Sequence, residues 1–264
     1  MVGERPFAVG GPFAVGGPFA GGAAFAVGGR WARAALLGVA LIAGAVAPAA
    51  AQCRLGLALG FDVSASVDQR EYRLMMQGTA TALMDPQVQA AVFSGPPVAL
   101  SAFVWAGARE QAIAAWWRVI DTPQDLAEFA DRLASFPRPD GDPLRTWGGR
   151  TGVGGAMAAA GQLLDQAPGC DALTLDLAGD GPSNDGPDAV PLPGVTVNAL
   201  AVGGDLPLDH DGAVDGLSLW YGALVIQGPG AFVMIANGFE DFADAMQRKL
   251  LRELMPALLG ALDP

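Results

Sequence analysis

The chain has few basic residues and very few of the side chains that most often act as general bases or soft metal ligands. Its 264 residues include 15 Lys and Arg against 27 Asp and Glu, with one histidine and two cysteines. The lone histidine, His210, lies in a polar loop sequence, which argues against a hydrolase triad, and one His with two Cys argues against a zinc site. The excess of acidic charge argues against binding to nucleic acid or to anionic lipid.

Long apolar runs are also scarce, and the clearest one lies near the N-terminus. Arg30 and Arg33 precede an apolar run over residues 34–46, which is followed by small residues up to Ala51. This layout predicts a signal peptide over residues 30–51 that is cleaved after Ala51. The run is shorter than the roughly 20 residues of a spanning helix, so no membrane anchor is expected in the mature chain.

Residues 1–29 repeat the pattern Pro-Phe-Ala-Val-Gly-Gly, a low-complexity extension with no pattern that could build a packed core. A translation start further along the chain would explain this extension. The expected organisation is therefore an extension at 1–29, a signal peptide at 30–51 and a single domain at 52–264, exported to the periplasm or secreted.

The segment 55–66, LGLALGFDVSAS, combines an apolar run with three regularly spaced polar side chains. The run predicts a strand buried on both faces of a parallel sheet, and ligands of open α/β sheets bind beyond the carboxyl ends of such strands. In an extended segment the oxygens of Asp62, Ser64 and Ser66 project to one side, as ligands of a hard divalent cation would. The alternative is a helix N-cap or an Asx turn that ends the strand.

Further apolar runs predict the rest of an α/β fold. Strands are expected at residues 98–105, 111–116, 171–178, 195–202 and 231–235, and helices at residues 69–83, 123–133, 152–166, 217–223 and 239–262. Two more polar residues come at the ends of such elements, Thr151 before a helix and Asp180 after a strand. A helix N-cap is the alternative for Thr151. The link over residues 187–194 is too short for a full crossover helix.

The two cysteines each stand at the start of a strand-like run. Cys53 comes nine residues before Asp62 and Cys170 ten before Asp180. If the two strands are parallel neighbours, both cysteines lie at the same end of the sheet, close enough to bond. A disulfide is therefore predicted for the exported protein, and a buried pair of free thiols is the alternative.

Three separated motifs, taken together, resemble a known site. Asp62-x-Ser64-x-Ser66, Thr151 in Gly-Arg-Thr-Gly and Asp180 in Gly-Asp-Gly resemble, in this order, the metal-ion-dependent adhesion site (MIDAS) of the von Willebrand factor type A (VWA) domain. The sequences GDGP at 179–182, GPGAFV at 228–233 and KLLRE at 249–253 are similar to an exported bacterial subfamily of unknown function. The resemblance covers nearly all of the mature chain.

The resemblance implies an α/β fold with a doubly wound, mostly parallel six-stranded sheet that has helices on both faces. It also implies a bound Mg²⁺, or Mn²⁺ or Ca²⁺, at the top of the sheet. Ser64 and Ser66 would bind the ion directly, and Thr151, Asp62 and Asp180 directly or through water. An acidic side chain of a protein partner would complete the coordination, so the protein would be a binding module and not an enzyme.

Three further residues and one connection bear on this interpretation. Trp147 and Asn184 are candidates for residues that line the site. The chain departs from the family pattern at Ala178, where a serine is missing, and in the short connection after Asp180.

Two other functions remain open. The run from Gly179 to Asp185 resembles the metal-binding loop of haloacid-dehalogenase-like phosphatases, with Asp62 as nucleophile. That family needs an acid where this chain has Ser64, and a basic residue for the phosphate, whereas the only lysine is Lys249. A scaffold domain with a vestigial metal site is the second alternative.

Overall fold

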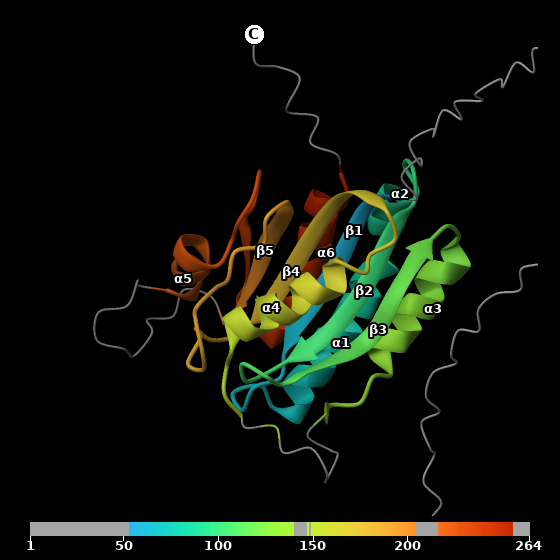
Figure 1. The fold of residues 1–264 in the computed structure, drawn as a ribbon. Helices are drawn as coiled ribbons and strands as arrows, with labels where there is room; N and C mark the ends of the chain where they lie inside the picture. Colours follow the sequence, from blue (N-terminus) through green and yellow to red (C-terminus); the bar gives the residue numbers. More distant parts are fainter. Residues whose placement is uncertain (1–52, 140–146, 148, 204–215, 256–264) are drawn as a thin grey trace, which may run out of the picture. The chain divides into compact units, whose positions relative to one another are not determined.

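The computed structural model describes residues 53–139, 147, 149–203 and 216–255. The predicted extension at 1–29, the predicted signal peptide at 30–51 and His210 lie outside the described residues. Figure 1 shows the described part as a twisted sheet with helices packed against it.

The sheet has six strands in the order β3-β2-β1-β4-β5-β6. All neighbouring strands are parallel except β2 and β3, which form an antiparallel hairpin at one edge. The apolar runs predicted these strands, although β3 continues to Ile120 and so is longer than expected. The strands are β1 (Cys53–Asp62), β2 (Val98–Trp105), β3 (Gln111–Ile120), β4 (Cys170–Gly179), β5 (Val195–Val202) and β6 (Val233–Ala236).

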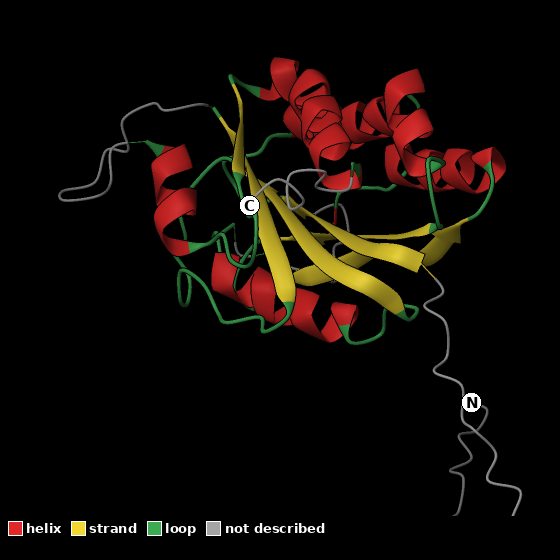
Figure 2. Cartoon of the chain, turned by 90° about the horizontal axis from the view of Figure 1, so that it is seen from above, coloured by secondary structure: helices red, strands yellow, loops and turns green. Residues whose placement is uncertain are grey.

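Helices cover both faces of the sheet, as Figure 2 shows from above. One apolar cluster joins the sheet to α1, α2, α3 and α6, and a second cluster on the other face joins it to α4 and α5. The described helices are α1 (Gln69–Leu83), α2 (Pro86–Val92), α3 (Pro123–Ala134), α4 (Val153–Leu164), α5 (Leu217–Leu224) and α6 (Phe242–Leu254).

Local capping signals account for several helix boundaries. Asp68 caps α1 and Thr122 caps α3, each within a capping box, and Asp85 caps α2. The N-cap of α4 is Gly152, without a side-chain hydrogen bond, so the interpretation of Thr151 as an N-cap is wrong. The last helix begins at Phe242, three residues later than predicted, because residues Phe239–Asp241 form a 3₁₀ turn.

The winding of the sheet reverses between β1 and β4. From β1 the chain passes through α1 and α2 to β2 on one side, whereas β4 leads to β5 on the other side. The described residues between β4 and β5 contain no helix, in keeping with the short link. In an open α/β sheet the ligand crevice lies beyond the carboxyl ends of the strands at such a reversal, which here are the ends of β1 and β4.

A disulfide joins the opposite, amino ends of the same two strands. Cys53 and Cys170 are paired in the sheet register and bonded, with Cα atoms 4.5 Å apart. The predicted disulfide is thus confirmed, and the alternative of two free thiols is wrong.

We expect the Cys53→Ala/Cys170→Ala variant to lose roughly 2 to 5 kcal/mol of unfolding free energy, because the bond closes a long loop in the unfolded chain. The bonded residues are 117 apart in sequence. Urea denaturation of the variant, beside the parent with and without a reductant, measures the loss. A variant as stable as the oxidised parent would contradict this account.

A buried cluster of charged side chains lies between β4 and α6. Lys249, fully buried, places its Nζ 2.7 Å from Asp176 Oδ1 and also pairs with Glu253. Asn198 donates a hydrogen bond from Nδ2 to Glu253 Oε1 at 2.7 Å. Two carboxylates thus share one ammonium group. Burial raises the pKa of Asp176 to about 7, although the charge of Lys249 lowers it.

The unfolding free energy of the metal-free protein should therefore fall as pH rises from about 4 to 7. A carboxyl group whose pKa is raised by folding contributes stability that is complete below its ordinary pKa and is lost as pH rises through the folded value. The Asp176→Asn variant should lose less unfolding free energy over this pH range than the parent, and the ion pair between Lys249 and Glu253 should stay intact. Urea titrations of parent and variant across this pH range test the point, and parallel curves would refute it.

Candidate metal centre

Asp62 ends strand β1 and lies fully buried at the reversal point of the sheet. The backbone N–H of Ser64 donates to its Oδ1 at 2.7 Å, which is the hydrogen bond of an Asx turn. Its Oδ2 is buried and has no hydrogen-bond partner among the described residues. The Asx turn therefore accounts for one carboxylate oxygen and leaves the other without a partner.

A chain of hydroxyl groups connects this turn to the end of β4. Ser64 Oγ and Ser66 Oγ lie 3.1 Å apart, at hydrogen-bond distance, and Ser66 Oγ donates to Asp180 Oδ1 at 2.8 Å. Ser64 is buried, whereas Ser66 is exposed and Asp180 is partly exposed. Four of the five predicted ligand residues thus lie together at the carboxyl ends of β1 and β4, where Ser66 is exposed to solvent.

Thr151, the fifth predicted ligand, is only 5% exposed and is held by its backbone. Its N–H donates to Asn184 Oδ1 at 2.9 Å, and its carbonyl oxygen accepts from the N–H groups of Asn184 and Asp185 at 2.8 and 3.0 Å. On the preceding side, Ala65 N–H donates to Gly149 O at 3.1 Å. The segment carrying Thr151 is therefore fastened to both loops that carry the other predicted ligands.

Gly152 allows this segment to approach the β2–β3 turn closely. A Cβ at this position would lie 2.4 Å from the backbone nitrogen of Ala108, which is closer than real side chains come. The N–H of Gly152 donates to Ala106 O at 2.7 Å. A residue without a side chain is thus required directly after Thr151.

The two residues predicted to line the site have different surroundings. Asn184 binds the Thr151 backbone as described, so it supports the loop that carries Thr151. Trp147 is partly buried and packs against the apolar cluster on the α1 face.

Sequence analysis missed Arg138 and Asp185. Arg138 donates from Nη2 to the carbonyl oxygens of Val63 and Ser64, at 3.1 and 3.2 Å. Asp185 Oδ2 accepts from the N–H of Ala108 at 2.9 Å. Arg138 comes from a loop without a recognisable motif, and Asp185 was considered only as the end of the run that resembles a phosphatase loop.

The two carboxyl groups of the site are difficult to ionise together. Burial, and then the charge of Asp180, raise the pKa of Asp62 to about 8, against the lowering effects of Ser64 and Arg138. Burial also raises the pKa of Asp180, while the hydrogen bond from Ser66 lowers it. A cation between them would favour the ionised form of both groups.

The chemistry of the donor set fits a hard divalent cation. It offers two carboxylates and three neutral hydroxyls and no soft ligand, as Mg²⁺ and similar ions prefer. Among the described residues no group of three His, Cys, Asp or Glu side chains gathers as a metal site, so such an ion would depend on the hydroxyls. The buried Oδ2 of Asp62 fits the same interpretation, since an unpartnered buried carboxylate oxygen is costly.

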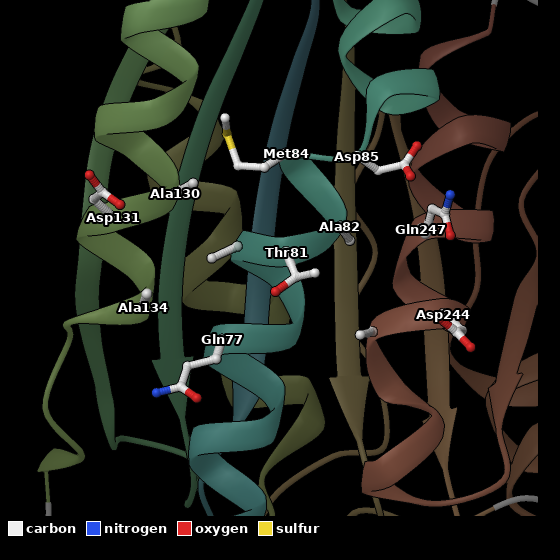
Figure 3. A pocket seen from close by; sticks show the side chains of 12 residues that line it. Gln77, Thr81, Ala82, Met84, Asp85, Ala130, Asp131, Ala134, Asp244 and Gln247 are labelled. Atoms are coloured by element: carbon white, nitrogen blue, oxygen red, sulfur yellow. The ribbon is translucent and has the colours of Figure 1, made fainter.

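A separate groove of about 690 Å³ lies between α1, α3 and α6 (Figure 3). Ala80, Ala82, Ala130 and Ala134 give it small side chains, and Asp131 and Asp244 stand at its sides. None of the predicted ligands lines this groove. It is therefore a different surface from the crevice at the ends of β1 and β4.

Comparison with known proteins decides the family. The family model described as "Protein of unknown function (DUF1194)" matches residues 52–258. The chain belongs to the DUF1194 family. A comparison with curated proteins finds no match.

Solved structures resemble this DUF1194 chain in fold. Proximal thread matrix protein 1 from the mussel byssus matches with a TM-score of 0.50 and 15% identity over 78% of this chain and 48% of its own. The pilus adhesin SpaC from Lactobacillus rhamnosus GG matches with a TM-score of 0.50 and 11% identity, over 76% of this chain and 30% of its own. A von Willebrand factor type A protein from Catenulispora acidiphila matches with a TM-score of 0.48 and 16% identity, over 76% of this chain and 43% of its own.

This chain spans less than half the length of the first solved chains that it matches. The strand order, with one antiparallel pair at the edge, is that of a VWA-like α/β fold, which confirms the fold predicted from the sequence. No helix within the described ranges is long and apolar enough to cross a membrane.

Asn184→Ala should expose the Thr151 amide to faster hydrogen exchange, by about fivefold to tenfold, because it removes a buried hydrogen-bond acceptor worth about 1 kcal/mol. Asn184→Asp keeps an acceptor oxygen and is the matched control, with a smaller expected change. Amide exchange followed by NMR in the metal-free protein measures the effect. Equal exchange rates in the parent and Asn184→Ala would contradict the holding role of Asn184.

Proposed function

We propose that this protein is an exported binding module that holds a Mg²⁺-type cation at the ends of β1 and β4 and uses it to bind a protein partner. Ser64, Ser66, Thr151, Asp62 and Asp180 would hold the ion, and Mn²⁺ or Ca²⁺ could take its place. The observation that carries the proposal is the chain of hydroxyl groups, Ser64 to Ser66 to Asp180, that joins the end of β1, where Asp62 is buried, to the end of β4. The bound ion would supply a Lewis-acid centre at the protein surface.

The chemistry of the partner follows from charge. Two carboxylates balance a divalent cation, and neutral hydroxyls leave it electrophilic, so it would attract an anionic oxygen. The chain itself has a formal net charge of −12, which repels an acidic partner wherever no cation intervenes. An acidic side chain of a partner protein is thus the proposed ligand, and its binding should require the metal.

Two features support export. The predicted signal peptide ends just before β1, and the bond between Cys53 and Cys170 is typical of an oxidising compartment. We therefore place the protein in the periplasm or outside the cell, without a membrane anchor in its mature form. Nucleic acid is not a proposed partner.

The phosphatase alternative finds less support. Lys249 is buried against Asp176 and Glu253, so it is not available to a phosphate near Asp62. Position 64 is a serine that hydrogen-bonds to Ser66, where that mechanism needs an acid. We accordingly propose a binding role and no catalytic one.

Calorimetric titration of Mg²⁺ and Mn²⁺ into the mature protein should give saturable binding at one site. The Asp62→Ala/Asp180→Ala variant should give none, because it removes both carboxylates. The Asp131→Ala/Asp244→Ala variant removes two carboxylates from the groove of Figure 3 and should bind as the parent does. No heat of binding in the folded parent would refute the proposal and favour a vestigial site.

The partner chemistry has its own test. A short Glu-containing peptide added to the Mn²⁺-loaded protein should change the water proton relaxation caused by the bound ion, because its carboxylate would displace a metal-bound water. A peptide with Gln in place of Glu is the matched control and should have no effect. Equal effects of both peptides would refute carboxylate coordination.

A further inference from the structure

Three buried polar groups converge beneath the candidate metal centre, around Gly179 at the end of β4. A methyl group on Gly179 would lie 2.6 Å from Tyr221 Oη, 3.3 Å from Asp62 Oδ2 and 3.4 Å from Trp105 Cζ2. These groups come from α5, β1 and β2, so three distant parts of the chain meet at one point. A glycine is required there because they occupy the space of its side chain.

Each of these groups is buried and has no hydrogen-bond partner among the described residues. This holds for the hydroxyl of Tyr221, the indole Nε1 of Trp105 and the Oδ2 of Asp62. Tyr221 and Trp105 are both fully buried. Buried polar groups are nearly always hydrogen-bonded, so three such groups at one point indicate an interaction between them.

Their hydrogen-bonding properties are complementary. Asp62 Oδ2 can only accept when the carboxyl group is ionised, the indole N–H can only donate, and the phenol hydroxyl can do both. The outer oxygen Oδ1 is already bound by the N–H of Ser64. The Tyr221 hydroxyl and the Trp105 indole, whose Cζ2 edge lies at the same point, are thus the donors that the packed core offers near Oδ2.

We propose that Tyr221 and Trp105 are positioning residues of the metal centre, which donate hydrogen bonds toward Asp62 Oδ2 through a water molecule. This inference rests on the proposed metal-binding function. The two donors would fix the rotamer of Asp62 and stabilise its negative charge from the inner side. The ion and the hydroxyls would then act on the outer side of the same carboxylate.

The expected loss of metal affinity can be taken from other residues that hydrogen-bond to metal ligands. Loss of such a supporting hydrogen bond typically weakens metal affinity by about 10-fold to 100-fold. Tyr221 is the better residue to change, because Phe keeps its ring and its packing in the core between the sheet and α5. Trp105 has no substitute that keeps its shape without its N–H.

The first experiment is titration of Mg²⁺ into the parent, Tyr221→Phe and Tyr72→Phe, with thermal unfolding to show that each is folded. Tyr72 is the matched control, because it is the other of the two tyrosines, is also buried, and donates its hydroxyl to Phe136 O instead. We expect about tenfold weaker binding for Tyr221→Phe and a change of less than about twofold for Tyr72→Phe. Equal affinity in the parent and Tyr221→Phe overturns this inference alone, whereas absence of binding in the parent overturns the proposed function and this inference with it.

A spectroscopic measurement separates positioning from simple packing. In the Tyr72→Phe protein, Tyr221 is the only tyrosine, so a ¹³C label on the tyrosine ring gives an NMR resonance that reports on Tyr221 alone. Mg²⁺ should shift this resonance because it changes the charge near the hydroxyl, and Asp62→Ala should shift it in the metal-free protein because it removes the acceptor oxygen. An unchanged spectrum in both cases would show that Tyr221 only fills the core, and this arm holds even if Tyr221→Phe does not fold.

Discussion

The parallel pairing of β1 with β4 fixes the arrangement on which the rest of the site depends. Its register sets Cys53 opposite Cys170 at one end and Phe61 opposite Ala178 near the other. Asp62 and Asp180 therefore leave the sheet side by side, and Ser66 can bridge to Asp180. A shift of one residue would send these side chains to opposite faces, because strand side chains alternate. The disulfide at the amino ends opposes such a shift.

Much of this arrangement could be predicted from the sequence because its signals are local. Apolar runs indicated the strands and helices, and the pattern from Asp62 to Ser66 indicated a site at the end of β1. β3 exceeded its prediction because Trp117, Arg118 and Val119 extend the hairpin beyond the apolar run. The N-cap interpretation of Thr151 is wrong because α4 starts one residue later, after Gly152. Asn184 and Asp185, in the loop after β4, bind the Thr151 backbone, and these contacts have no local signal.

The residues that sequence analysis missed are those whose role depends on tertiary contacts. Arg138 reaches the carbonyl oxygens of Val63 and Ser64 from a Pro-rich loop some 75 residues later. Tyr221 lies in an apolar helix sequence, LSLWYGAL, in which a phenol is expected to serve as core. Only the packing around Gly179 shows that its hydroxyl lies beside Asp62. Periodicity indicates which face of a helix is buried, but not which polar atom it meets there.

The two buried aspartates of the sheet differ in the source of their counter-charge. Asp176 lies 2.7 Å from the ammonium group of Lys249, so the chain itself supplies its cation. At Asp62 the guanidinium of Arg138 donates to backbone carbonyls and its charge lowers the pKa of the carboxyl group, yet burial and Asp180 still raise that pKa to about 8. A buried carboxylate is costly to ionise without a cation or hydrogen bonds. This difference supports a counter-ion that comes to Asp62 from outside the chain.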